Sequence, residues 1–199
     1  VKVYGGGQAS VCTEKDIPKP DDLYGDSKWQ AEQLLQNIAG QTNMELVILR
    51  PPPVYGPGVK DNFLRLIKLV DAGIPLPLAG IKNKRSMIYV GNLADAVIQC
   101  IQHPEASGET FLVSDGCDVS TKELLVLIAD SLNKKAQLFY LPETLLKPAG
   151  RLIGREGDVR RLCASLYVDI TKIKAKLGWV PPFSLAEGIT ETIRWYKNK

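Results

Sequence analysis

The sequence contains one histidine, His103, and four cysteines that lie far apart and form no CxxC pair. Zinc sites need clustered histidine and cysteine ligands, and disulfide frameworks need cysteines at paired spacings. We therefore expect no metal site and no disulfide, as in a reducing compartment. Apolar runs near the roughly 20 residues that cross a bilayer are absent too, and no signal peptide is recognisable. These absences predict a cytoplasmic protein without stable membrane insertion.

A surplus of charge of one sign is also absent. The chain of 199 residues carries 25 basic and 22 acidic residues, a formal net charge of +3, and its clearest basic cluster is the short segment Lys82–Arg85. Domains that bind nucleic acid usually carry a broad basic face or stripe. The charge balance therefore disfavours nucleic acid as a partner. With 45% hydrophobic residues, the chain has the composition of a globular protein with a substantial core.

The apolar patterns predict strands that alternate with helices. Extended segments are expected at 1–4, 45–50, 86–90, 110–113 and 137–141, and helices at 22–39, 63–72, 93–102, 121–132, 143–152, 170–177 and 185–197. The apolar run 45–50 is typical of a parallel strand covered on both faces, and the proline-rich segment 51–58 that follows is expected to be irregular. This order predicts an α/β fold with a partly parallel sheet and a smaller mixed lobe.

Two helices have predicted inward faces. In the helix at 93–102, the inward residues are expected to be Leu93, Val97, Cys100 and Ile101. In the helix at 22–39, the row with helical spacing consists of Tyr24, Lys28, Ala31, Leu35 and Ile38. This row places a lysine on an otherwise apolar face. Because lysine is almost never fully buried without a partner, the pattern predicts that Lys28 works together with Tyr24.

Tyr24 and Lys28 are one helical turn apart, a spacing suited to removing a proton from an alcohol. A nearby ammonium favours the phenolate by charge attraction, so the phenol becomes a candidate general base. The structural alternative is a tyrosine at a helix start beside a lysine whose ammonium extends into water. The five residues alone leave both interpretations open.

Several motifs together resemble one family. They are Tyr24-Gly25-Asp26-Ser27-Lys28 with Ala31-Glu32, Leu49-Arg50-Pro51, Val54-Tyr55-Gly56-Pro57-Gly58, Arg85-Ser86-Met87-Ile88-Tyr89-Val90 with Leu93-Ala94, and Asp169-Ile170-Thr171-Lys172 with Leu177-Gly178-Trp179. In this order and spacing, the chain resembles an extended short-chain dehydrogenase/reductase of the nucleotide-sugar epimerase/dehydratase family, UDP-glucose 4-epimerase-like. The resemblance extends from residue 3 to the C-terminus.

The resemblance implies a tightly held NAD, with NADP left open. Tyr24 would take the proton of the sugar 4-hydroxyl while hydride passes to the nicotinamide, and Lys28 would bond the cofactor ribose. Pro51, Pro52 and Pro53 would border the nicotinamide. The family's catalytic serine or threonine would stand immediately ahead of Val1, and its glycine-rich phosphate loop further upstream. The sequence therefore indicates the later part of a longer protein.

Substrate-binding residues are implied as well. The backbone N–H groups of Asn62 and Phe63 at a helix start suit a diphosphate, and Arg85 and Arg161 suit charge-assisted bonds to it. The structural interpretations are a helix cap for Asn62 and a surface ion pair for each arginine. The expected partner is a small UDP-sugar.

The domain organisation follows from the same resemblance. Residues 1–60 would form the second half of the dinucleotide-binding domain, with the catalytic helix. Residues 61–199 would form mainly the substrate lobe, with about 86–103 returning to the first domain. The resulting fold class is the C-terminal portion of a doubly wound Rossmann-type parallel sheet plus a small mixed α/β substrate-binding lobe. We expect a homodimer.

The sequence is compatible with several functions. The favoured one is a 4-epimerase of a UDP-hexose or UDP-N-acetylhexosamine, and the second is an NAD(P)H-dependent reductase of a UDP-4-keto-(6-deoxy)hexosamine. Dehydration is disfavoured, because Val1 and Lys2 stand where the dehydratases of the family carry two acids. A non-catalytic dinucleotide-binding homologue and a peripheral membrane role for 145–153 are less favoured. The glycine-rich segment 5–10 is not expected to hold phosphate, because the prolines that follow it prevent the required helix.

Overall fold

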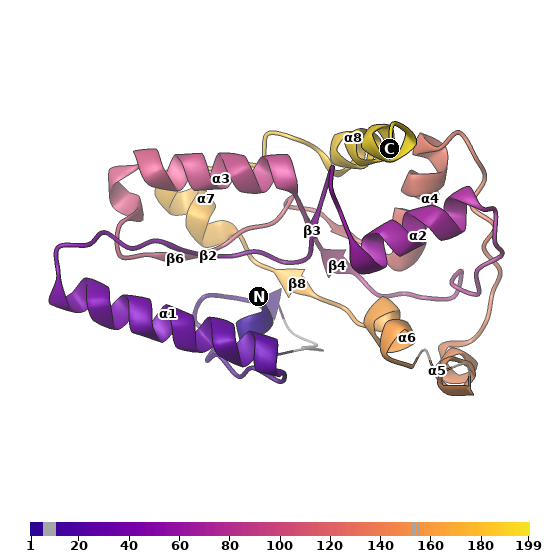
Figure 1. Ribbon diagram of the computed structural model, residues 1–199, viewed down its shortest axis with the longest axis horizontal. Coiled ribbons are helices and arrows are strands. Elements are labelled where there is room, and N and C mark those ends of the chain that lie inside the picture. The colour runs from indigo at the N-terminus through magenta and orange to yellow at the C-terminus, as the bar shows by residue number, and fades with distance from the viewer. Residues whose placement is uncertain (6–10, 153, 155) are drawn as a thin grey trace. The chain divides into compact units, whose positions relative to one another are not determined.

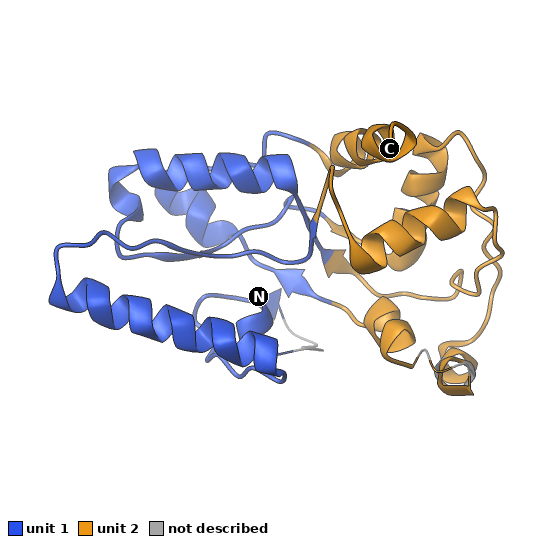
Figure 2. Ribbon diagram, in the orientation of Figure 1, with its two compact units in different colours: residues 1–54, 86–117, 166–183 blue, residues 55–85, 118–165, 184–199 orange. Residues whose placement is uncertain are grey.

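The structure is a computed structural model that describes residues 1–5, 11–152, 154 and 156–199. The chain forms two compact units (Figure 2). Unit 1 comprises residues 1–54, 86–117 and 166–183, and unit 2 comprises residues 55–85, 118–165 and 184–199. Each unit is therefore assembled from segments that are distant in the sequence. The predicted glycine-rich segment lies outside the described residues except for Gly5.

Unit 1 is built around two pairs of parallel strands. Its elements are η1 (Lys2–Tyr4), β1 (Val11–Cys12), α1 (Leu23–Gln41), β2 (Ile48–Arg50), β5 (Ile88–Tyr89), α3 (Val90–Gln102), η2 (Pro104–Ala106), β6 (Thr110–Leu112), β8 (Tyr167–Val168) and α7 (Thr171–Leu177). Strand β2 pairs with β6 in the register Ile48↔Thr110 to Arg50↔Leu112, and β1 pairs with β8. Figure 1 shows α1 on one side of β2 and β6, and α3 with α7 on the other.

The alternation of side chains along β6 explains this layered arrangement. Phe111 and Val113 are fully buried in one hydrophobic cluster, which includes residues of α3 and α7, whereas Leu112 is fully buried in a second cluster with Val3 and Tyr4. Successive side chains of a strand point to opposite faces, so both faces of β6 are covered. The predicted parallel strands with helices on both sides are confirmed.

Unit 2 is mainly helical. Its elements are α2 (Asp61–Asp71), β7 (Asp118–Val119), α4 (Thr121–Ser131), α5 (Glu143–Leu152), α6 (Glu156–Cys163) and α8 (Leu185–Lys197), and the short strands β3 (Val54–Tyr55) and β4 (Arg85–Ser86) lie where the chain passes between the units. Helices α4 and α8 both begin with a capping box, formed by Ser120 with Glu123 and by Ser184 with Glu187. No helix of the described residues is long and apolar enough to cross a membrane.

Several predicted segments are corrected. Residues 1–4 contain the 3₁₀ helix η1 instead of a strand, since the N–H groups of Tyr4 and Gly5 bond back to Val1 and Lys2. Residues 137–141 form only one isolated parallel bridge, Leu76↔Leu138, because the contacts with 76–79 are too irregular for a strand. Helix α6, in the polar segment 156–163, was not predicted, since only three of its residues, Val159, Leu162 and Cys163, are apolar.

The predicted inward face of α3 is partly wrong. Cys100 is buried as expected, but Val97 is exposed and 78% of the Ile101 surface is accessible. The buried residues of α3 are Asn92, Ala96 and Cys100, at i, i+4 and i+8. Asn92 faces inward because its amide donates to Asp115 and to the Phe183 carbonyl, at 2.7 and 2.9 Å. A fully hydrogen-bonded polar side chain thus occupies a position that hydrophobicity alone assigns to the surface.

Gly80 allows the segment 137–141 to lie close to the loop before β4. A Cβ atom at residue 80 would lie 3.0 Å from the Leu141 carbonyl oxygen and 2.9 Å from a ring carbon of Tyr140. We expect Gly80→Ala to reduce the free energy of unfolding by about 1–3 kcal/mol, the usual cost of overpacking. Urea unfolding monitored by circular dichroism measures this change.

Gly157→Ala in α6 is the matched control, since no atom lies within 4 Å of its Cβ position. It should leave stability unchanged or raise it by up to about 1 kcal/mol through helix propensity. Equal effects of the two substitutions would show that the close approach at Gly80 is unimportant.

Candidate functional site

Tyr24 and Lys28 lie on one face of the first turns of α1. The helix begins as expected after Asp22, whose carboxylate accepts a hydrogen bond from the Gly25 N–H at 2.7 Å. The Lys28 ammonium lies 5.4 Å from the centre of the Tyr24 ring. The predicted pairing of the two side chains along the helix is thus present.

The predicted burial of this row is wrong. Tyr24 is 61% exposed, Lys28 is exposed, and Leu35 and Ile38 further along the row are exposed as well. Among the residues of α1, only Gly25 is buried. The periodicity identified a real helical row, but the described residues of the chain do not cover it. The phenol and the ammonium are therefore accessible to a ligand.

A buried ion pair anchors the same helix to the sheet. Arg50 ends β2 and is only 6% exposed, and its guanidinium binds both carboxylate oxygens of Glu32 on α1. The shortest contact joins Arg50 Nη2 to Glu32 Oε2 at 2.6 Å. Two parallel N–H to oxygen bonds fix the relative orientation of both groups. Burial alone would lower the pKa of Arg50, but the bonds to Glu32 raise it above its usual value.

The same guanidinium also holds η1. Arg50 Nη1 donates to the hydroxyl oxygen of buried Tyr4, and the guanidinium carbon lies 5.0 Å from the centre of the Tyr4 ring and 5.8 Å from that of Trp29. Burial raises the pKa of the Tyr4 phenol, although the neighbouring Arg50 opposes this rise. Tyr4 is therefore a neutral hydrogen-bonding partner at physiological pH.

These contacts join the helical row to the proline-rich loop. Glu32 lies on the same helix as Tyr24 and Lys28, four residues after Lys28, and Arg50 directly precedes Pro51. The loop is held further by the Val1 backbone nitrogen, which donates to the Pro51 carbonyl at 2.8 Å, and by the Ile88 N–H, which donates to the Pro53 carbonyl at 3.1 Å. Within unit 1, the predicted catalytic row and the predicted cofactor loop are thus connected through one ion pair.

In unit 2, the predicted substrate-binding residues lie on α2, α6 and the strand β4. Asn62 and Phe63 lie in the first turn of α2, which has no side-chain cap, so the interpretation of Asn62 as a helix cap is wrong. Phe63 stacks on Tyr55, with ring centres 5.4 Å apart. The backbone N–H groups at this helix start are therefore not used by a capping side chain.

Arg85 and Arg161 are brought together. The Arg85 guanidinium donates to the backbone carbonyl of Arg161, and burial lowers the pKa of Arg85. Neither arginine forms an ion pair with any residue that the structure describes, so the surface ion-pair interpretation finds no support there. Helix α6 also approaches α2, since Arg65 Nη1 lies 2.6 Å from the Asp158 carboxylate (Figure 1). The four predicted residues thus belong to neighbouring segments of unit 2.

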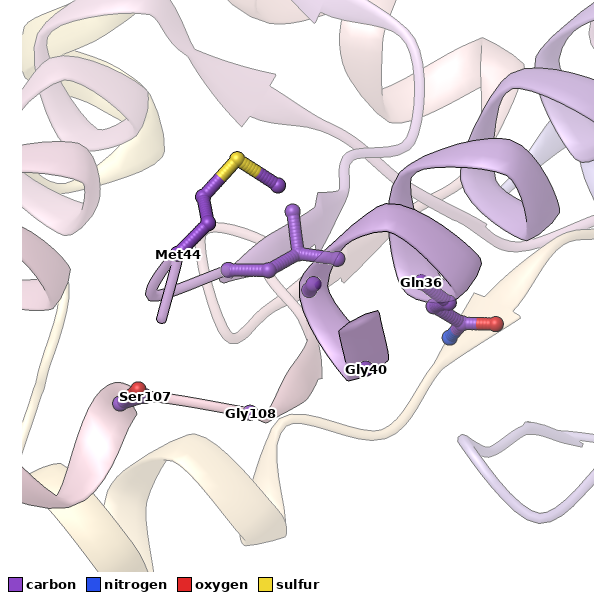
Figure 3. A pocket seen from close by; sticks show the side chains of 7 residues that line it. Gln36, Gly40, Met44, Ser107 and Gly108 are labelled. Carbon is purple, nitrogen blue, oxygen red and sulfur yellow. The ribbon is translucent and has the colours of Figure 1, made fainter. Parts of the chain in front are cut away.

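Unit 1 also has a surface hollow. Its volume is about 270 Å³, and its lining residues are Gln36, Ala39, Gly40, Met44, Leu46, Ser107 and Gly108 (Figure 3). Figure 3 shows Gln36 and Gly40 of α1 on one side, and Met44 and Ser107 on the other. The hollow has no ionisable side chain and none of the predicted site residues. It offers no group for acid–base chemistry.

Parallel strands covered by helices on both faces, with a Tyr-x-x-x-Lys helix beside them, define a Rossmann-type α/β protein of the short-chain dehydrogenase/reductase class. The family model described as GDP-mannose 4,6 dehydratase matches residues 2–192. The chain belongs to this family of nucleotide-sugar-modifying proteins. The resemblance and the fold class expected from the sequence are both confirmed.

Curated relatives and solved structures agree with this assignment. The chain is 46% identical over 195 residues to a UDP-glucose 4-epimerase of Vibrio cholerae, a match that covers 96% of this chain and 60% of that protein. It is 28% identical over 209 residues to the N-acetyl-alpha-D-glucosaminyl-diphospho-ditrans,octacis-undecaprenol 4-epimerase of Escherichia coli O157:H7, with 98% and 62% covered. The structure of MoeE5 in complex with UDP-glucuronic acid and NAD matches with a TM-score of 0.75 and 27% identity, over 99% of this chain and 62% of that one. The chain thus spans about 60% of the length of the relatives it matches.

The Arg50–Glu32 pair yields a stability prediction. Arg50→Met leaves the Glu32 carboxylate without its partner in a largely buried place, so we expect the free energy of unfolding to fall by about 3–5 kcal/mol. The double variant Arg50→Met, Glu32→Leu should recover most of this loss, because no unpaired charge remains. Urea unfolding of the three proteins measures the difference.

Arg65→Met is the control, because Arg65 and Asp158 form a more exposed pair and its loss should cost less than about 1 kcal/mol. If Arg50→Met were no more destabilising than Arg65→Met, the anchoring role of Arg50 would be disproved.

Proposed function

We propose that the protein is a nucleotide-sugar 4-epimerase that acts on a UDP-hexose or UDP-N-acetylhexosamine with enzyme-bound NAD. The observation that carries the proposal is the accessible Tyr24 phenol with the Lys28 ammonium 5.4 Å from its ring centre. Similarity to a UDP-glucose 4-epimerase over 96% of the chain supports the same reaction type. Similarity to an epimerase of an N-acetylglucosaminyl diphospholipid supports an N-acetylhexosamine as the alternative sugar.

Tyr24 would act as the base and then as the acid. Its phenolate oxygen takes the proton of the sugar 4-hydroxyl, and the phenol returns that proton after the configuration at C4 has changed. The Lys28 ammonium lies beside the phenol, 5.4 Å from the centre of its ring. Exposure of the phenol suits this role, because the sugar hydroxyl has to reach it.

Lys28 and the proline loop that begins at Pro51 suit the nicotinamide end of a dinucleotide. Lys28 offers three N–H donors for ribose hydroxyls, and Pro51, Pro52 and Pro53 form a rigid loop that lacks backbone donors and suits an apolar ring face. When bound, NAD would supply the hydride acceptor and donor for C4 of the sugar. Among the described residues, no glycine-rich turn joins a strand to a helix to hold the pyrophosphate.

The substrate diphosphate has suitable partners in unit 2. The uncapped start of α2 presents the N–H groups of Asn62 and Phe63 together with the positive end of the helix dipole. Arg85 and Arg161, which lack carboxylate partners in the described part of the chain, supply guanidinium groups suited to phosphate oxygens. These observations support a nucleoside diphosphate as the non-reacting part of the substrate.

The reaction type is tested by cofactor stoichiometry. The intact protein is incubated with UDP-glucose or UDP-N-acetylglucosamine and a catalytic amount of NAD, and the products are separated by chromatography and identified by NMR. We expect a C4 epimer without net NADH formation. In a parallel incubation with a UDP-4-keto sugar and NAD(P)H, conversion with equimolar NAD(P)H consumption, and no epimer in the first incubation, would identify the reductase instead. Binding of dinucleotide without turnover of any sugar would identify a non-catalytic homologue.

Tyr24→Phe tests the role of the phenol. Loss of general acid–base catalysis should reduce kcat by about 10²–10⁴-fold, while the Kd of the UDP-sugar stays nearly unchanged. Kinetics and calorimetric titration measure the two quantities. Tyr140→Phe, at an exposed tyrosine of unit 2, is the control and should retain full activity. A Tyr24→Phe variant that lost UDP-sugar binding but kept its turnover per bound complex would contradict the assigned role.

A further inference from the structure

Asn83–Arg85 is a segment of the basic cluster of the sequence. Each of its residues forms a hydrogen bond with the end of α6 or with the two residues that follow this helix. The Asn83 amide donates to the carbonyls of Leu162 and Ala164, at 2.9 and 3.0 Å. The next two residues continue this contact, because the Lys84 N–H donates to the Ser165 hydroxyl at 3.3 Å and the Arg85 guanidinium donates to the Arg161 carbonyl. Three consecutive residues of unit 2 thus follow the segment 161–165.

Asn83 also connects α6 to α4. Its amide oxygen accepts a hydrogen bond from the Thr121 N–H at 3.0 Å, at the first residue of α4. The Thr121 hydroxyl in turn donates to the Leu162 carbonyl at 2.7 Å. Asn83 is only 5% exposed, so these bonds form away from water. One side chain therefore joins the end of one helix to the start of another.

The chemistry of this position suits a primary amide. An amide side chain supplies two donors and an acceptor without a charge, whereas a carboxylate has no donor and an ammonium has no acceptor. Every described buried side-chain nitrogen and oxygen atom has a hydrogen-bond partner, and Asn83 uses both ends of its amide. Its loss would leave the Thr121 N–H and the Ala164 carbonyl without these partners in a buried place.

We propose that Asn83 is the positioning residue for the anion-binding arginines of unit 2. Arg85 follows Asn83 by two residues, and Arg161 lies one residue before Leu162, whose carbonyl Asn83 binds. Asn83 therefore fixes the two backbone segments from which both guanidinium groups extend. This inference rests on the proposed function, because it assigns the role of these arginines in holding the substrate diphosphate.

The test compares binding of UDP with turnover in Asn83→Ala. We expect the Kd for UDP and the KM for the UDP-sugar to rise about tenfold, with kcat changed by less than about twofold. Kd and KM should change while kcat does not, because Asn83 acts on the diphosphate site and not on the reacting sugar carbon. A general loss of folded protein would instead lower the active fraction and leave the Kd of the remainder unchanged.

A milder pair of variants keeps the inference testable if Asn83→Ala does not fold. Thr121→Val removes the hydroxyl that bonds Leu162 but keeps the shape of the side chain and the backbone bond to Asn83. We expect Thr121→Val to raise the Kd for UDP severalfold and Thr121→Ser, which keeps the hydroxyl, to bind like the unsubstituted protein. An equal Kd for all three proteins would overturn the inference.

Asn92→Ala is the matched control for Asn83→Ala. Asn92 is also a buried asparagine with three hydrogen bonds, but it belongs to unit 1. We expect it to lower stability without raising the Kd for UDP. Equal weakening of UDP binding by both variants, or by neither, would overturn the positioning role of Asn83. Absence of UDP binding by the unsubstituted protein would overturn the proposed function as well.

Discussion

The ion pair of Arg50 and Glu32 is the interaction on which the arrangement of unit 1 depends. One buried guanidinium binds the helix that carries Tyr24 and Lys28, the hydroxyl of Tyr4 in η1, and through its own backbone the loop that begins at Pro51. A buried charge is tolerated only when it is paired and hydrogen-bonded, and bidentate geometry leaves little freedom to slide or rotate. The helix that carries the proposed catalytic residues is therefore fixed through Glu32, while Tyr24 and Lys28 stay exposed.

In unit 2, an uncharged side chain has the role that the Arg50 guanidinium has in unit 1. The proposed anion-binding groups extend from segments that the neutral amide of Asn83 holds together, and these segments meet α4 at Thr121. Each unit thus contains a buried polar side chain, Arg50 or Asn83, whose hydrogen bonds are made within the protein. This side chain holds in place the groups that have to face a ligand. Such networks are costly when half satisfied, so they specify one arrangement of the surrounding backbone. That specificity is what transfer of one proton at one hydroxyl requires.

Much of the fold follows from local sequence signals, whereas contacts between distant residues do not. The helices at 143–152 and 185–197 were predicted with the bounds observed, since their apolar spacing marks them. The exposure of the row of α1 could not be foreseen, because periodicity identifies a face but not what covers it. The partners of Arg50 and Asn83 are separated from them by 18 to 81 residues, so no local pattern reveals them.

The most direct test of this account is a crystal structure of the protein with NAD and a UDP-sugar bound. The account predicts that the Tyr24 hydroxyl lies within about 3.2 Å of the sugar 4-hydroxyl oxygen, with Lys28 at the cofactor ribose and the Arg50–Glu32 pair intact. A bound sugar whose 4-hydroxyl meets a different side chain, with Tyr24 still directed into solvent, would contradict it.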